Sequence, residues 1–199
     1  MLDQVPARPA LVVATPGAEP VAEGGYSAAL LLDAWALLDR PVLRAGEETL
    51  RRWLAAAALV RPGSEGGRVV VTTDAGQRQA QALLRWDPIG AARRELADRR
   101  ELGYPPSDWM AELWGTPAAV EELLTVAHLP AAAEVLGPLP ESIRASGRGD
   151  GVPRVRSLVR VPLDDAAAAA SALAAAQGVR SARKAPEAVR VRVDPVDLA

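Results

Sequence analysis

A charged helical run stops abruptly in the middle of the chain, at RRELGYPP from Arg99 to Pro106, and this stop restricts the possible folds. Gly103 can adopt the left-handed conformation that ends a helix, and Pro105 cannot continue one because it lacks a backbone N–H. A helix that ends this sharply inside a chain is typical of a joint between two structural parts. We therefore expect a helical strut that leads into a separate C-terminal domain.

The part before the strut, residues 1–76, has an α/β pattern. A helix is predicted for Leu43–Val60, because Leu50, Leu54 and Ala57 recur along one face. Short apolar runs closed by turn residues or rich in β-branched residues predict strands. These strands are Pro9–Gly17, the start of Ser27–Trp35 (which then runs into a helix), and Arg68–Asp74.

The strut and its joint occupy residues 77–106. A first helix is predicted from Gln77 to Trp86. Asp87 then acts as the N-cap of a second helix, with Pro88 in its first turn, and this helix runs from Ile89 to about Glu101.

After the joint, residues 107–199 show a second pattern. Strictly alternating runs predict half-buried strands, and capped apolar runs predict helices. Thr116 and Pro117 begin the first helix, and Asp164 and Gly178 are expected to cap and close the second. The resulting order is βαββαβ, the ferredoxin-like arrangement, with a long hairpin loop at residues 141–152. The four strands are Trp109–Thr116, Ala133–Pro140, Pro153–Pro162 and Ala188–Pro195.

Composition excludes several classes of protein. The chain has no Cys, which excludes disulfides, thiolate metal sites and Cys nucleophiles, and no apolar run reaches the ~20 residues that span a bilayer. No signal peptide is predicted, so a cytoplasmic location is expected. The net charge of −2 is not that of a typical nucleic-acid binder, but residues 137–199 carry ten Lys/Arg against seven Asp/Glu. A basic end on an acidic body hints at a surface that faces phosphate.

Arginines supply the candidate binding surface. Side chains of one parity on neighbouring antiparallel strands share a face of the sheet, and two Arg residues in the Gly-rich loop could extend that face. A phosphate-tracking surface is one interpretation, and an ordinary solvated sheet face is the other. Trp53, Trp86, Trp109 and Trp114 are interpreted as core residues, with base stacking as the alternative. The candidate phosphate contacts are Arg144, Arg148, Arg154, Arg156, Arg160, Arg190 and Arg192.

Motifs for catalysis and for metal binding are not found. The chain has one His, His128, and no Walker-type lysine loop, and Asp164 and Asp165 are explained as helix-start residues. No catalytic residue and no metal ligand is therefore predicted.

Three stretches resemble the C-terminal part of the PriA family of primosomal replication restart proteins. They are RRELADRRELGYPP, which resembles the family's strut and joint, AEVLGPLP, which resembles its VLGP turn, and the terminal VRVRVDPVDLA. The resemblance orders the chain from about residue 70 to its end. It implies that residues 107–199 contribute to binding forked DNA, with primosome proteins as partners.

The resemblance places residues 1–76 at the end of the second helicase lobe. Of the family's Gly-Thr-Gln motif only Thr15 remains, and of its Gln-Arg motif only Arg61, with Leu54 and Ala58 at the positions of the Gln and the first Arg. Alanine cannot stabilise transition-state charge as an arginine finger does. The lobe is thus expected to be a degenerate remnant, of the kind found in actinobacterial members, without ATPase activity. The family's ATP and zinc are expected to have no site in this chain.

The predicted function is DNA binding and primosome scaffolding by the C-terminal part of a PriA-like protein, in the cytoplasm and near the nucleoid. Two alternatives remain open. One is a ferredoxin-like module that senses a small ligand or forms oligomers. The other is a binding domain for the acidic tail of single-strand DNA-binding protein, which the family also suggests.

Overall fold

The computed structural model of the chain describes residues 4–140 and 153–195. It divides into two compact units, the first up to Glu95 and the second from Leu96 to Pro195. The division falls inside helix α4, Pro88–Leu102, so the predicted strut belongs in part to each unit. Each unit is described separately below.

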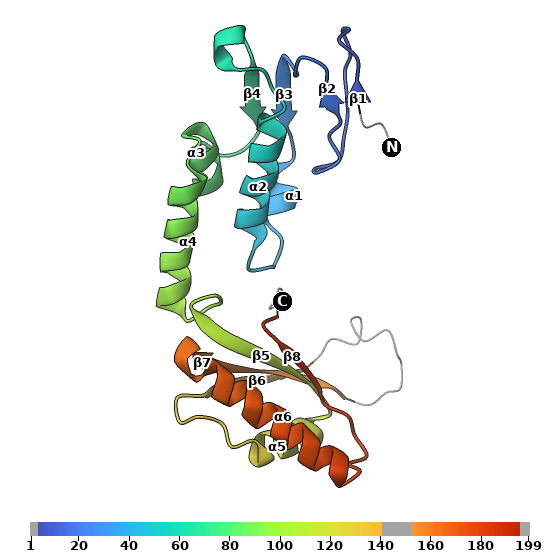
Figure 1. Cartoon of the computed structure of the whole chain (residues 1–199), viewed down its shortest axis with the longest axis vertical. Coiled ribbons are helices and arrows are strands. Elements are labelled where there is room, and N and C mark those ends of the chain that lie inside the picture. Colours follow the sequence, from blue (N-terminus) through green and yellow to red (C-terminus); the bar gives the residue numbers. More distant parts are fainter. Residues whose placement is uncertain (1–3, 141–152, 196–199) are drawn as a thin grey trace. The chain divides into compact units, whose positions relative to one another are not determined.

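The first unit is built from short parallel strand pairs and helices (Figure 1). Strand β3 pairs in parallel with β4, and β1 pairs in parallel with β2. The strand that leads into a helix and the β-branched strand are both present, as predicted. The elements are β1 Gln4–Val5, β2 Val21–Ala22, β3 Ala28–Leu31, α1 Ala34–Leu38, α2 Ala45–Ala57, a 3-10 turn at Gly63–Glu65, β4 Arg68–Val71 and α3 Arg78–Leu84.

Helix α2 supplies much of this unit's core. Leu50, Trp53 and Ala57 are buried on one face of the helix, and Leu54 packs against the same cluster in a partly buried position. Their i, i+3, i+4 and i+7 spacing puts all four side chains on one stripe, which packs against α1, α3 and the ends of β3 and β4. The helical face expected from the sequence is confirmed, and the core interpretation of Trp53 holds.

The strand predicted at Pro9–Gly17 is wrong. This segment is irregular, and the side chains of Leu11 and Val13 are both 90% exposed. A strand needs a neighbouring ladder to satisfy its backbone groups, and prolines at residues 9 and 16 remove two of the donors that a ladder would use. An apolar run without a strand partner does not make a strand.

Helix α4, Pro88–Leu102, begins and ends as the sequence predicts. The Asp87 side chain accepts a hydrogen bond from the Gly90 amide at 2.7 Å, which satisfies one of the unpaired N–H groups of the first turn. Gly103 has φ 64°, and the amide of Tyr104 donates to the Arg99 carbonyl at 2.8 Å. The helix therefore ends in a left-handed glycine, before the proline pair.

The second unit contains a four-stranded antiparallel sheet with two helices on one side (Figure 1). The strand order is β6-β7-β5-β8, and the elements follow one another in the order βαββαβ that the sequence predicts. Thr116 caps α5 by accepting a bond from the Ala119 amide. The elements are β5 Asp108–Gly115, α5 Pro117–Val126, β6 Glu134–Pro140, β7 Val155–Pro162, a 3-10 turn at Leu163–Asp165, α6 Ala166–Ala182 and β8 Arg190–Val193.

The core of this unit lies between the helices and one face of the sheet. Leu113 on β5, Val159 on β7, Leu123 on α5 and Leu173 on α6 belong to one buried cluster. Because successive side chains of a strand point to opposite faces, the other parity of β5, β7 and β8 lies on the face away from the helices. That face carries the predicted arginines.

The limits predicted for α6 need correction. The helix continues through Gly178 to Ala182, and its N-cap is Asp165, which makes no side-chain capping bond, while Asp164 lies in the preceding 3-10 turn. A glycine inside a helix costs roughly 1 kcal/mol relative to alanine. This cost is outweighed here because Arg180, in the last turn, is held by tertiary contacts.

Candidate nucleic-acid interface

The strand register brings the predicted arginines of β7 and β8 to one face of the sheet. Trp114 on β5 lies opposite Arg156 of β7 on one side and opposite Arg190 of β8 on the other. In the next row, Glu112 lies opposite Leu158 of β7 and Arg192 of β8. We call this part of the sheet the arginine face: Arg156, Arg190, Arg192, Trp114 and Glu112.

Trp114 is half-buried at the centre of the first row. The guanidinium carbon of Arg190 lies 5.4 Å from the centroid of the Trp114 ring, which is within the range of a cation–π contact. Arg190 and Arg192 are exposed, whereas the Arg156 side chain is 20% exposed. An aromatic ring beside exposed guanidinium groups offers both a stacking surface and charge for phosphate.

Glu112 is the one acidic residue within the arginine face, and it is only 1% exposed. Its Oε1 lies 3.3 Å from a terminal nitrogen of Arg156. Burial raises the pKa of the Glu112 carboxyl, while the charges of Arg156, Arg192 and Arg190 act to lower it. The sequence analysis did not single out Glu112, although it shares the parity of Trp114 within the run WMAELWG.

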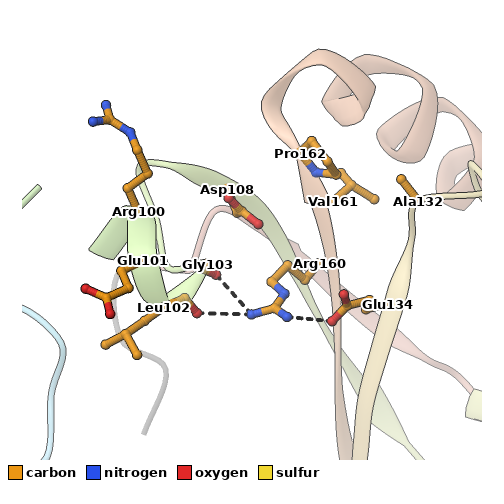
Figure 2. Close-up of a pocket in the computed structure, with 10 residues that line it drawn as sticks. All are labelled: Arg100, Glu101, Leu102, Gly103, Asp108, Ala132, Glu134, Arg160, Val161 and Pro162. Atoms are coloured by element: carbon orange, nitrogen blue, oxygen red, sulfur yellow. Dashed lines mark hydrogen bonds and ion pairs between the residues drawn. The ribbon is translucent and has the colours of Figure 1, made fainter. Parts of the chain in front are cut away.

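Arg160 has a different environment from the other arginines. Its guanidinium donates to the carbonyls of Leu102 and Gly103, at 3.2 and 3.4 Å, and to Glu134 at 2.5 Å (Figure 2). It thereby ties the end of α4 to strands β6 and β7. These contacts line a pocket of about 480 Å³, into which Asp108 also reaches.

The remaining candidate arginines lie outside these rows. Arg154 is exposed and precedes β7 by one residue, with the same parity as Arg156. Arg144 and Arg148, together with the predicted hairpin loop, lie outside the described residues. The structure thus brings Arg156, Arg190 and Arg192 together.

Two buried arginines were missed by the sequence reasoning. Arg180 of α6 pairs with Glu122 of α5 and donates to the Glu187 carbonyl at 2.6 Å. Arg99 of α4 donates to the Pro105 carbonyl at 3.3 Å, inside the joint. Both contacts depend on tertiary structure, and a charged residue on a helix gives no local signal of burial.

The two residues assigned to a remnant helicase motif lie in the first unit. Thr15 is exposed and begins a turn, with its carbonyl accepting a bond from Ala18. Arg61 donates from Nε to the carbonyls of Gly24 and Gly25, at 2.9 and 3.2 Å. Through Nε, the Arg61 guanidinium is thus tied to the backbone of the segment that contains both glycines.

The part of the chain that the structure describes shows neither a metal cluster nor a membrane-spanning helix. Within it, no group of three or more His, Cys, Asp or Glu side chains could hold a metal ion. Over the same residues, none of the helices combines the length and the apolar character needed to cross a bilayer.

Comparison with known proteins identifies the class of this domain. A family model described as the primosomal protein N C-terminal domain matches residues 100–196, which covers the joint and the whole βαββαβ unit. The chain belongs to the PriA family of replication restart proteins, and it corresponds to the C-terminal part of such a protein.

The curated relatives carry the PriA name. The chain is 51% identical over 201 residues to the probable replication restart protein PriA of Mycobacterium leprae, strain TN. It is 47% identical over 208 residues to the protein of the same name from Mycobacterium tuberculosis, strain H37Rv. The alignments cover 100% of this chain and 31% and 32% of the relatives, so the chain spans about a third of their length. The resemblance drawn from the strut, the turn and the terminal strand is confirmed.

Proposed function

We propose that this chain contributes DNA binding to replication restart through the arginine face of its second unit. The observation that carries the proposal is the cross-strand row Arg156–Trp114–Arg190, with Arg192 exposed in the next row. Guanidinium groups contact phosphate, and an aromatic ring between them can stack on a base. Arg154, one residue before β7, has the same parity as Arg156, and Arg144 and Arg148 are further candidate contacts.

The expected ligand is branched or forked DNA, bound together with other primosome proteins. Under this proposal residues 107–199 form a ferredoxin-like domain, which the antiparallel order β6-β7-β5-β8 and the two helices on one face support. Residues 1–76 form a degenerate remnant of helicase lobe 2, which the parallel pair of β3 and β4 supports. The protein acts in the cytoplasm, close to the nucleoid.

The chain itself is proposed to bind neither ATP nor zinc and to act as a scaffold rather than as a helicase. Arg61, the one arginine retained from the family's Gln-Arg motif, is held by backbone carbonyls of Gly24 and Gly25. Ala58 stands where the family places the first arginine of that motif. ATP turnover by the purified chain would refute this part of the proposal.

A second candidate partner is the acidic tail of single-strand DNA-binding protein. The exposed guanidinium groups of Arg190 and Arg192 would attract an acidic peptide as they would a phosphate backbone. A tail peptide that displaces DNA from the chain would indicate overlapping sites. Simultaneous binding of both would require separate sites.

The test is a salt series of binding to a labelled fork, with the wild-type chain and the double variant R190Q/R192Q. Each lost phosphate contact lowers the slope of log K against log salt by ~0.9 for duplex DNA, so the variant should lose roughly two units of slope. R8Q/R40Q removes the same charge from exposed positions in the first unit and serves as the matched control. Equal slopes in all three proteins would refute a role for these arginines.

A further inference from the structure

Glu112 carries a buried carboxyl group, and the fold replaces its lost hydration only in part. Its Oε1 faces Arg156, but its Oε2 accepts no hydrogen bond from any described residue. An ionised carboxylate removed from water is strongly destabilised unless charges or hydrogen bonds replace its hydration. The ionised form of Glu112 therefore depends on the arginines around it.

Both strands that pair with β5 place positive charge around Glu112. Strand β7 contributes Arg156, and strand β8 contributes Arg192 directly opposite and Arg190 in the next row. On the other side of Glu112, its row continues through the apolar Leu158 of β7 to Leu136 of β6. The charged groups that face Glu112 are thus three guanidinium groups, which are the groups offered to DNA.

A phosphate backbone on this face would change the potential at Glu112. Phosphates that pair with the arginines neutralise the positive charge that keeps the carboxyl ionised, and their own negative charge acts in the same direction. Desolvation of the carboxyl remains, since it comes from the protein's own packing. The neutralised arginines and the added phosphate charge therefore both favour the protonated carboxyl when DNA is bound.

We propose that Glu112 is a positioning residue of the arginine face, and that binding of a phosphate backbone is coupled to uptake of one proton by its carboxyl. This inference rests on the proposed DNA-binding function. The proton comes from the solvent buffer and forms an O–H bond on the carboxylate, so that the bound complex keeps no uncompensated buried anion. In the free chain, Glu112 pairs with Arg156. When the phosphates of DNA pair with the arginines, the Glu112 carboxylate becomes protonated.

The direction of the pH dependence follows from linkage. The pKa of Glu112 is higher in the complex than in the free chain, so the complex binds more protons. Affinity for DNA therefore rises as the pH falls through the window between the two pKa values, by up to about tenfold per pH unit for one coupled proton. Above this window the dependence disappears.

Calorimetry of the full chain with the forked DNA measures the proton directly. Binding heats at one pH are compared in buffers of different ionisation enthalpy, and the slope gives the number of protons taken up. We expect about one more proton for the wild type than for Glu112→Gln within the linkage window. Glu134→Gln, which removes a carboxyl on the same sheet that pairs with Arg160, should keep the wild-type uptake.

A titration of the free chain keeps the inference testable if Glu112→Gln fails to fold. Carboxyl carbon NMR of Glu112 should show a higher midpoint in Arg192→Gln than in the wild type, and no change in Arg183→Gln, at an exposed position on the end of α6. An unchanged midpoint in Arg192→Gln would overturn the coupling within the cluster.

The outcomes separate this inference from the proposed function. A folded wild-type chain that does not bind the fork overturns both. Binding with equal proton uptake in the wild type and Glu112→Gln overturns the coupling and leaves the DNA-binding function in place. Proton uptake that is lost only in Glu112→Gln supports both.

Discussion

Replacing Arg160 by methionine should loosen the end of α4 without unfolding the domain. Methionine keeps much of the aliphatic length but removes the donors to Leu102, Gly103 and Glu134. A hydrogen bond from a charged donor contributes about 1.5–3 kcal/mol, and an exposed ion pair about 0–1 kcal/mol. Glu134 is 59% exposed and the Gly103 bond is long, so the better carbonyl bond dominates and we expect a loss of about 2 kcal/mol.

Amide hydrogen exchange measures this loss where it occurs. A cost of about 2 kcal/mol is a factor of about 30 in the local opening equilibrium. Protection of the Tyr104 amide, which bonds to the Arg99 carbonyl, should fall by that factor. Arg192→Met is the control, because it removes an exposed arginine of the same sheet from β8, which lies on the other side of β5 from Arg160. Equal protection in the two variants would show that Arg160 does not hold the strut.

Four further outcomes test the packing and electrostatics. Gly178→Ala should stabilise the protein to urea by about 0.5–1 kcal/mol, because the added Cβ meets nothing within 4 Å and the site is helical; Gly103→Ala should destabilise it, since φ is 64°. Leu173→Ala should cost about 2–5 kcal/mol in the same assay. Two arginines lower the pKa of Glu48 to about 2, so its small stabilising contribution is complete above about pH 4.5. Thermal melts should show it lost toward pH 2 in the wild type and absent in Glu48→Gln.

The sequence predicted correctly those helix ends and strands that depend on residues close to one another in the chain. The cap at Asp87, the glycine at residue 103 and the threonine at residue 116 each set a helix end through bonds to near neighbours. Alternation predicted β7 and β8, because a period of two residues requires no knowledge of the partner strand. The prediction from a short apolar run closed by a turn failed for Pro9–Gly17, which pairs with no strand among the described residues.

Of the candidate site, the sequence could predict only which side chains share a face of the sheet, because strand parity sets this. Parity placed Arg156, Arg190 and Arg192 on one face, and the register confirms that they share it. Parity could not show that Arg160 is held by the end of α4, 58 residues away in sequence. Nor could it show the burial of Glu112, which depends on strands that lie on both sides of β5.

Strand β8 is an edge strand of the described sheet, so its arginines can also affect how the protein associates with other molecules. An edge strand presents unpaired backbone groups that can pair with a strand of another molecule. Charged side chains on the edge strand hinder such pairing by mutual repulsion. Arg190 and Arg192 stand on a strand of four residues, so they make up half of it. The residues proposed to hold DNA also protect the protein against aggregation. Variants that neutralise both arginines should therefore be less soluble than the wild type when DNA is absent.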